Sequence, residues 1–168
     1  MGNVFEKPTL EVNCKAAVAI AGKAKQAGIK HFVFASSCSV YGFADAAPRT
    51  ELSEVSPLTA YARSKVEGEK GLEAIADNNF RVTCLRFATA CCYSDRLRLY
   101  LVLNDFVASA VAVKKISILS DGTPWRPLIH VKDMARAMDW AIHRDHTSPF
   151  LVINTGSNAW NYQVKELA

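Results

Sequence analysis

Short apolar segments alternate with longer stretches of helical periodicity along most of the chain. Between residues 10 and 27 the apolar positions recur every three or four residues, and Gly28 follows, which predicts an amphipathic helix that ends there. Residues 31–36 are largely apolar, aromatic and β-branched, a pattern typical of a buried parallel strand. Residues 42–57 are mainly polar and include prolines, so we expect a loop.

The rest of the chain continues this alternation. Ser56 followed by Pro57 predicts the N-cap and first turn of a helix that runs to about residue 76. The further expected elements are a strand at 80–87, a helix at 97–113, a strand at 116–119, a turn at 121–124, a helix at 131–143, a strand at 150–154 and a helix start at 162–168. This order predicts an α/β fold with a mostly parallel sheet. Such a sheet should begin with a strand, so the helices at both chain ends suggest truncation.

Composition narrows the class of protein. The chain has 168 residues, half of them hydrophobic, which suffices for one domain with a substantial core. It has no apolar run of the roughly 18–20 residues that a membrane span needs, and it lacks a secretory signal, so we expect a cytoplasmic protein without a membrane partner. The net charge is +4, and the Lys and Arg residues are scattered among Asp and Glu rather than clustered, which argues against a nucleic-acid partner.

The cysteines and histidines give no metal pattern. The five cysteines include no C-x-x-C pair, which favours reduced, mostly buried thiols. His143 and His146 could share a helix face, but they lie in a polar stretch before Pro149. We therefore expect no metal site.

The strongest chemical signal is Tyr61 followed by Lys65. A spacing of four places both side chains on one face of a helix, where the ammonium would favour the phenolate and lower the tyrosine pKa. A tyrosine tuned in this way can exchange a proton with a substrate hydroxyl near neutral pH. Taken alone, the spacing also arises by chance in many helices.

Ser37 strengthens this interpretation. It lies at the end of the expected strand 31–36, and ligands of open α/β sheets bind outside the carboxyl ends of strands. A serine there can hydrogen-bond the hydroxyl that the tyrosine deprotonates. Without the Tyr61–Lys65 pair, a serine-rich turn would be the preferred interpretation.

These motifs together resemble a known family. Residues 36–42 read S-S-C-S-V-Y-G and residues 57–65 read P-L-T-A-Y-A-R-S-K, which resembles the active-site signature of extended short-chain dehydrogenases/reductases. The nearest group is the NAD-dependent epimerase/dehydratase family, which acts on nucleotide sugars. Residues 125–133 resemble the family's R-x-x-x-H-V-x-D block.

The resemblance implies catalytic and cofactor roles. Tyr61 would be the general acid/base, Lys65 would hold the nicotinamide ribose and tune Tyr61, and Ser37 would orient the substrate hydroxyl. Phe87 would lie near the nicotinamide, and Asn13 would support a proton relay or a ligand contact. The implied cofactor is NAD, with NADP possible.

It also implies a substrate site. Asn104 would contact the diphosphate of a nucleotide-sugar substrate and Arg126 would clamp its phosphate, although Arg126 could equally be a solvated turn residue. Thr89 stands where the family has an asparagine. Cys92 stands where the family has a glycine, so this cysteine would have to adopt a backbone conformation that favours glycine. His130 and Asp133 are better explained as a helix start.

The implied fold is a partial Rossmann-like, doubly wound parallel sheet that lacks its first strands, plus part of a small C-terminal substrate-binding region. Residues 1–90 would form the C-terminal half of the NAD-binding domain. Residues 91–168 would combine substrate-binding elements with a returning strand and helix. The helices at 10–27 and 57–76 resemble those that pair subunits in the family, so we expect a homodimer.

Two departures from the family pattern matter. The chain has no glycine-rich turn and no following acidic residue, so on its own it should bind NAD poorly or not at all. Cys38 and Ser39 replace the Asp-Glu pair of the family's 4,6-dehydratases, which argues against that subclass.

Three functions therefore remain open. The first is an NAD-dependent nucleotide-sugar epimerase, present here in part. The second is an NAD(P)H-dependent sugar or ketone reductase of the same superfamily. The third is a catalytically inactive chain that acts only as a dimerising module.

Overall fold

The chain folds into two compact units. A computed structural model describes residues 5–43, 47–145 and 147–168. The first unit consists of Met1–Arg86 and Ala137–Asn154, and the second of Phe87–Arg136 and Thr155–Ala168. The expected divisions at residues 1–90 and 91–168 stay a prediction.

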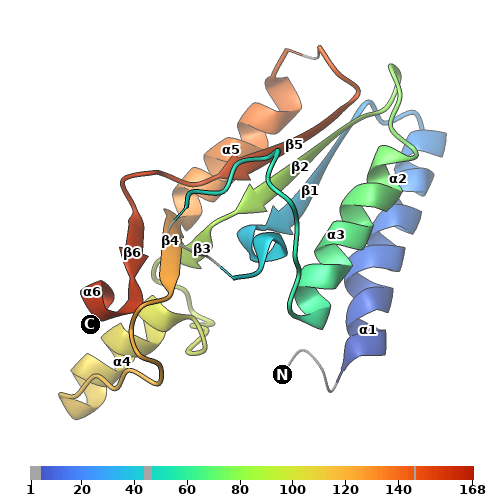
Figure 1. The fold of residues 1–168 in the computed structure, drawn as a ribbon. Helices are drawn as coiled ribbons and strands as arrows, with labels where there is room; N and C mark the ends of the chain where they lie inside the picture. Colours follow the sequence, from blue (N-terminus) through green and yellow to red (C-terminus); the bar gives the residue numbers. More distant parts are fainter. Residues whose placement is uncertain (1–4, 44–46, 146) are drawn as a thin grey trace. The chain divides into compact units, whose positions relative to one another are not determined.

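A three-stranded sheet forms the centre of the first unit. Its strands are β1 (His31–Ser37), β2 (Arg81–Phe87) and β5 (Phe150–Thr155), in the order β1-β2-β5, and their arrows point the same way in Figure 1. All three were expected from their apolar, β-branched runs, and each prediction is confirmed within one residue. The parallel direction places the ends of the three strands at one edge of the sheet.

Helices cover one face of this sheet (Figure 1). A continuous helical segment comprises α1 (Glu6–Leu10), the π-helical turn η1 (Glu11–Lys15) and α2 (Ala16–Gln26), and α3 (Ala60–Glu73) packs beside it. The segment ends as predicted, with Gly28 at a φ of 78°. Its start lies earlier than the expected residue 10. Helix α3 approaches α2 closely at Gly71, where a Cβ would lie 2.7 Å from a methyl carbon of Val18.

The start of α3 differs from the prediction. Thr59, rather than Ser56, is the N-cap: its hydroxyl accepts a hydrogen bond of 3.1 Å from the amide of Ala62. The amide of Ser56 instead donates to the carbonyl of Val40, at 2.9 Å. This tertiary hydrogen bond holds the residues around Pro57 in the loop, so the helix begins three residues later than that proline suggests.

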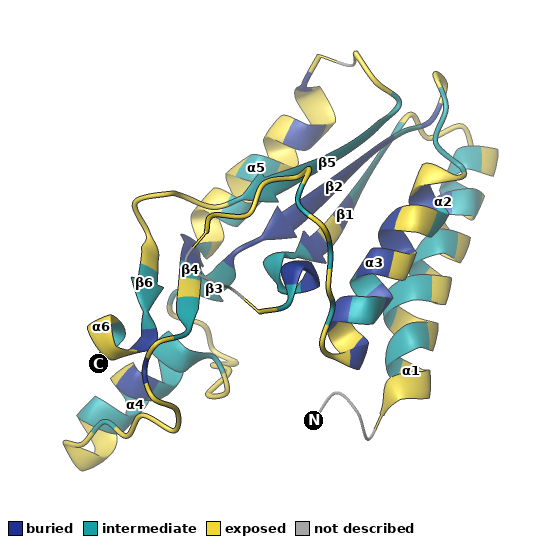
Figure 2. Ribbon diagram, in the orientation of Figure 1, coloured by how far each residue is buried: buried dark blue, intermediate teal, exposed yellow. Residues whose placement is uncertain are grey.

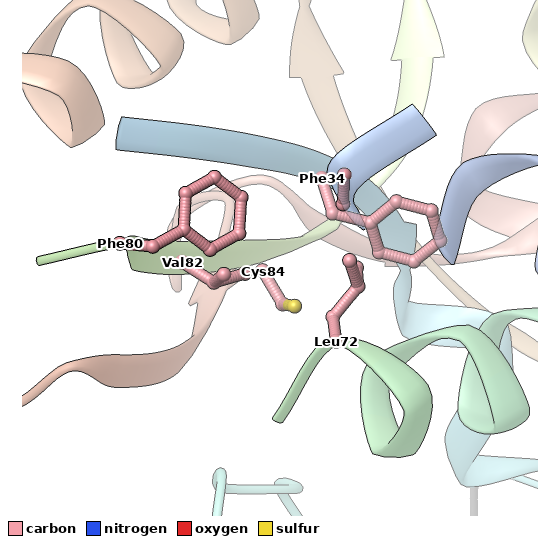
Figure 3. Packing of buried hydrophobic residues seen from close by; sticks show 6 residues of the cluster. Phe34, Leu72, Phe80, Val82 and Cys84 are labelled. Atoms are coloured by element: carbon pink, nitrogen blue, oxygen red, sulfur yellow. The ribbon is translucent and has the colours of Figure 1, made fainter. Parts of the chain in front are cut away.

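The apolar core of the first unit joins the helices to the sheet. Its buried residues come from α2, α3, β1, β2 and the approach to β2: Ala21, Phe34, Leu72, Phe80, Val82 and Cys84. Figure 3 shows Phe34, Leu72 and Cys84 lying together in this cluster. In Figure 2 the buried positions of α3 face the sheet, whereas much of the α1–α2 segment is only partly buried. The core therefore fixes α3 on the face of β1 and β2.

The second unit contains a smaller mixed sheet. Strand β3 (Thr89–Cys91) runs parallel to β4 (Trp125–His130), and β4 runs antiparallel to β6 (Asn161–Gln163). Its helices are α4 (Val102–Val113) and α6 (Val164–Leu167). Helix α5 (Val131–His143) continues from β4 and ends within the first unit.

Several sequence predictions for the second unit are wrong. Residues 116–119 form no strand, because they are largely exposed and pair with no neighbouring strand. The strand is instead β4, whose residues pair with both β3 and β6. The helix expected at 97–113 begins only at Val102, and the helix expected at 162–168 is preceded by β6 and begins at Val164.

The described residues contain no cluster of three or more His, Cys, Asp or Glu side chains able to hold a metal ion. Within the same residues, no helix has the length and apolar character needed to cross a membrane. The Nδ1 atom of His143 lies 2.9 Å from the backbone carbonyl oxygen of Asp139 and 3.4 Å from its carboxylate, and His146 lies outside the described residues. The five cysteines, all within the described residues, form no disulfide, but only Cys84 is buried, so the prediction of mostly buried thiols is wrong.

Candidate functional site

Helix α3 presents a row of three polar side chains along one face. Tyr61, Lys65 and Glu69 are spaced by four residues, so they lie one above the other. The Nζ atom of Lys65 lies 5.4 Å from the centre of the Tyr61 ring. The expected proximity of the phenol and the ammonium is therefore present in the fold.

Lys65 also connects the helix to the end of β1. Its Nζ donates a hydrogen bond of 2.7 Å to the carbonyl of Ala35 and lies 4.8 Å from the centre of the Phe34 ring. Burial lowers the pKa of Lys65, and the nearby Cys84 and Glu69 act in the opposite direction. An ammonium has three donors, so two remain after the bond to Ala35 for hydroxyls of a ligand.

Ser37 ends β1 and begins the short 3-10 helix η2 (Cys38–Tyr41). Its Oγ accepts hydrogen bonds from the amide of Ser39 at 3.2 Å and from the hydroxyl of Ser39 at 2.9 Å. Both lone pairs of Ser37 are thus engaged, and its own proton remains to be donated. A ligand oxygen at the carboxyl end of β1 could accept this proton in a hydrogen bond.

Tyr61 and Asn13 complete the candidate residues of the first unit. The Tyr61 side chain is 42% exposed, so a solute can reach it. Asn13 lies in η1, whose backbone packs against α3: the Asn13 carbonyl oxygen would be 3.6 Å from a Cβ placed on Gly68. The first unit therefore contains Asn13, Ser37, Tyr61 and Lys65, with Lys65 joining Tyr61 to the strand that ends in Ser37.

The remaining candidates belong to the second unit. Phe87 is buried where β2 ends, and Thr89 pairs with Leu128 in the parallel ladder of β3 and β4. Asn104 lies in the first turn of α4 and donates its side-chain amide to the carbonyl of Arg98, at 3.2 Å. Arg126 lies exposed on β4 rather than in a turn, and its Nη1 donates to its neighbour's carbonyl.

Cys92 does not have the conformation expected from the family's glycine. Its φ is 159°, which is close to extended backbone that any residue adopts. The expected strain of a cysteine at this position is therefore absent. His130, in contrast, behaves as expected: its Nδ1 accepts a hydrogen bond of 3.1 Å from the amide of Lys132 at the start of α5.

Sequence reasoning missed a buried ion pair between Glu69, one helical turn after Lys65 on α3, and Arg86 on β2. Glu69 and Arg86 are 5% and 7% exposed. The Arg86 guanidinium donates to both carboxylate oxygens of Glu69, from Nε at 3.0 Å and from Nη2 at 2.6 Å. Two signals were available: an acidic residue one turn after Lys65 on the same helix face, and an arginine within the apolar run 80–87.

Comparison with known proteins places the chain in a family. Residues 3–156 match the model of the "NAD dependent epimerase/dehydratase family". The chain belongs to this family. This match confirms the resemblance drawn from the motifs at residues 36–42 and 57–65. It also confirms that the enzymes of the family depend on NAD.

Relatives and solved structures agree with this assignment. UDP-glucose 4-epimerase of Mycolicibacterium smegmatis is 32% identical over 130 residues, which cover 75% of this chain and 41% of that protein. UDP-glucose 4-epimerase of Haemophilus influenzae is 30% identical over 188 residues, covering 99% of this chain and 55% of that protein. The structure "MoeE5 in complex with UDP-glucose and NAD" matches with a TM-score of 0.79 and 31% identity, covering 94% of this chain and 52% of that one.

The chain thus spans about half the length, or less, of the epimerase/dehydratase relatives that it matches. Within this span, Lys65 fits the NAD of the family because two of its three donors remain for ribose hydroxyls. The sequence contains no glycine-rich turn to receive the cofactor's pyrophosphate. The 168 residues therefore suit only part of the dinucleotide.

Proposed function

We propose that this chain provides the proton-transfer and sugar-nucleotide-binding part of an NAD-dependent nucleotide-sugar epimerase. The observation that carries the proposal is the Tyr61–Lys65 pair on α3, held by the Ala35 carbonyl beside the end of β1. Ser37 follows two residues after Ala35, with a hydroxyl proton still to donate. A phenol, an ammonium and a hydroxyl are the groups needed to move a proton at a sugar hydroxyl.

In the proposed reaction Tyr61 takes the proton from a ring hydroxyl of the substrate and later returns it. Ser37 donates a hydrogen bond to the same oxygen, which stabilises the carbonyl that forms there. The ammonium of Lys65 favours the deprotonated phenol and would hold the ribose of NAD. When bound, NAD supplies the reversible hydride transfer at the carbon that carries this hydroxyl.

The proposed substrate is a nucleoside diphosphate sugar. The similar MoeE5 structure is a complex with UDP-glucose and NAD, and the M. smegmatis relative is named for UDP-glucose. Asn104 and Arg126 would contact the diphosphate, since amide and guanidinium donors suit phosphate oxygens. Epimerisation is favoured over dehydration because Cys38 and Ser39 have no carboxylate with which to eliminate water.

Interconversion of UDP-glucose and UDP-galactose tests the proposal directly. The test protein is M. smegmatis UDP-glucose 4-epimerase in which the matched segment is replaced by this chain, so that every proposed catalytic residue is supplied by the chain. We expect NAD-dependent formation of UDP-galactose, followed by NMR of the anomeric protons. A folded hybrid that binds NAD but forms neither epimer nor keto sugar would contradict the proposal, whereas net NAD(P)H consumption would favour a reductase.

The absence of a glycine-rich turn leads to a separate expectation for the chain by itself. We expect millimolar NAD to leave the Tm of the 168-residue chain unchanged, because a ligand raises Tm only when it binds the folded state. Differential scanning fluorimetry with and without NAD measures this, with the hybrid protein as the positive control. A saturable rise in the Tm of the chain would show that NAD binds without that turn.

We also propose that two copies of the chain pair through the α1–α2 segment and α3. Support comes from an exposed apolar row on the helical segment, in which Val12 and Ile20 are 67% and 61% exposed and Ala16 lies between them. We expect Ile20→Lys to convert a dimer into a monomer, measured by size-exclusion chromatography with light scattering. Leu52→Lys, at a loop position that is 97% exposed, is the matched control and should leave the mass unchanged.

A further inference from the structure

A chain of buried polar side chains extends from Glu69 to the ends of all three strands in the first unit. At one end, the Ser36 hydroxyl donates a hydrogen bond of 2.5 Å to Oε1 of Glu69. Ser36 is 3% exposed and directly precedes Ser37 in β1. Glu69 therefore holds the residue next to the proposed substrate-orienting serine.

The other end of this polar chain passes through Arg86. Its Nη1 donates a hydrogen bond of 2.8 Å to the hydroxyl of Tyr41, and its guanidinium lies 5.1 Å from the centre of the Tyr41 ring. The Tyr41 hydroxyl in turn donates to Oδ1 of Asn154, at 2.7 Å, in β5. Tyr41 is the last residue of η2, the short helix that Ser37 caps.

The ion pair thus holds both ends of the segment that carries Ser37. Glu69 holds the start of residues 36–41 through Ser36, and Arg86 holds the end through Tyr41. Glu69 also lies one turn after Lys65 on the same face of α3. The same carboxylate therefore links the helix of Tyr61 and Lys65 to the segment of Ser37.

We propose that Glu69 and Arg86 are positioning residues, which fix the Ser37 segment relative to the Tyr61–Lys65 face of α3. The proposal rests on the proposed function for its catalytic meaning. Burying an apolar pair could stabilise the fold equally well, because desolvation offsets much of the attraction within a buried ion pair. An apolar pair would lack directional contacts. The hydrogen bonds of Glu69 to Ser36, and of Arg86 to Glu69 and Tyr41, fix the orientation of α3, β1 and η2 relative to one another.

The test is amide hydrogen exchange in the 168-residue chain, read at the amides of Ser39 and Gly42 within the Ser37 segment. We expect Glu69→Gln to speed their exchange about tenfold relative to the amide of Val82, the order of effect of losing a buried hydrogen bond. The Val82 amide is bonded to the Pro149 carbonyl and reports on the sheet itself. A loss of overall stability alone would raise exchange at all three amides together.

Two further variants complete the design. Glu67→Gln, on the same helix, removes an exposed partner of Lys70 and should leave the ratio of exchange rates unchanged. Tyr41→Phe removes the hydroxyl contacted by Arg86 and should also loosen the segment, which keeps the test decisive if Glu69→Gln does not fold. Unchanged ratios in the folded variants would overturn the positioning role. Exchange needs no turnover, so an inactive hybrid protein would contradict only the proposed epimerase function.

Discussion

Arg86→Met is expected to lower the free energy of unfolding by about 3–5 kcal/mol, because it leaves the carboxylate of Glu69 buried without its counter-ion. Burial by itself lowers the pKa of Arg86, but hydrogen bonds to Glu69 and Tyr41 raise it above its ordinary value, so the guanidinium is charged in the folded protein. Urea denaturation followed by circular dichroism measures the loss.

The double variant Glu69→Leu with Arg86→Met separates the loss of the pair from the exposure of a lone charge. We expect it to recover most of the lost stability, since well-packed apolar side chains can replace a buried ion pair. Arg63→Met is the matched surface control: Arg63 pairs with Glu6 at 2.7 Å, but both side chains are more than a third exposed, so its effect should stay below about 1 kcal/mol. Equal losses for Arg86→Met and Arg63→Met would contradict the expected cost of leaving Glu69 as an unpaired buried charge.

Tyr61→Phe in the hybrid epimerase is expected to lower kcat by about 10²–10⁴-fold, because the substrate hydroxyl loses its proton acceptor. Binding should change little, because the ring remains and only one hydroxyl is removed from a side chain that is 42% exposed. Steady-state kinetics with UDP-glucose would therefore show a large fall in kcat and a nearly constant KM.

Tyr100→Phe provides the comparison for this prediction. Tyr100 is 70% exposed, and its hydroxyl accepts a hydrogen bond from Arg98 on the surface of the second unit. We expect its kcat to equal that of the unmodified hybrid. If Tyr61→Phe also turned over at the unmodified rate, the proton would have to leave through another group, and the role assigned to Tyr61 would be wrong.

The sequence predicted the first sheet well because its strands are short apolar runs that also pair with one another, in the order β1-β2-β5. β1, β2 and β5 all fall within a residue of their expected positions. Residues 116–119 had the same local character but form no strand. A strand needs a partner for its hydrogen bonds, and in the second unit residues 125–130 have that partner on both sides.

In the candidate site, too, the local sequence predicted some features and tertiary packing decided others. The spacing of Tyr61 and Lys65 placed them on one helix face, and that proximity is present at 5.4 Å. Local patterns marked Glu69 and Arg86 separately, as an acidic residue on the Tyr61–Lys65 face and an arginine in an apolar run. They did not indicate that the two would meet, because a helix end, a turn and most of a strand separate them. Their pairing follows from the packing of α3 on the sheet.

By itself the sequence determined the identity of the chemical groups, the helix face that carries them and the family to which the chain belongs. These depend on residue type and on spacing within one element, which follow from the chain locally. Only the tertiary structure decided that Lys65 reaches the Ala35 carbonyl, that Thr59 rather than Ser56 begins α3, and that a buried carboxylate joins the helix to the segment of Ser37. Those features depend on contacts between residues far apart in the chain, which form only when the apolar faces of helix and sheet pack together.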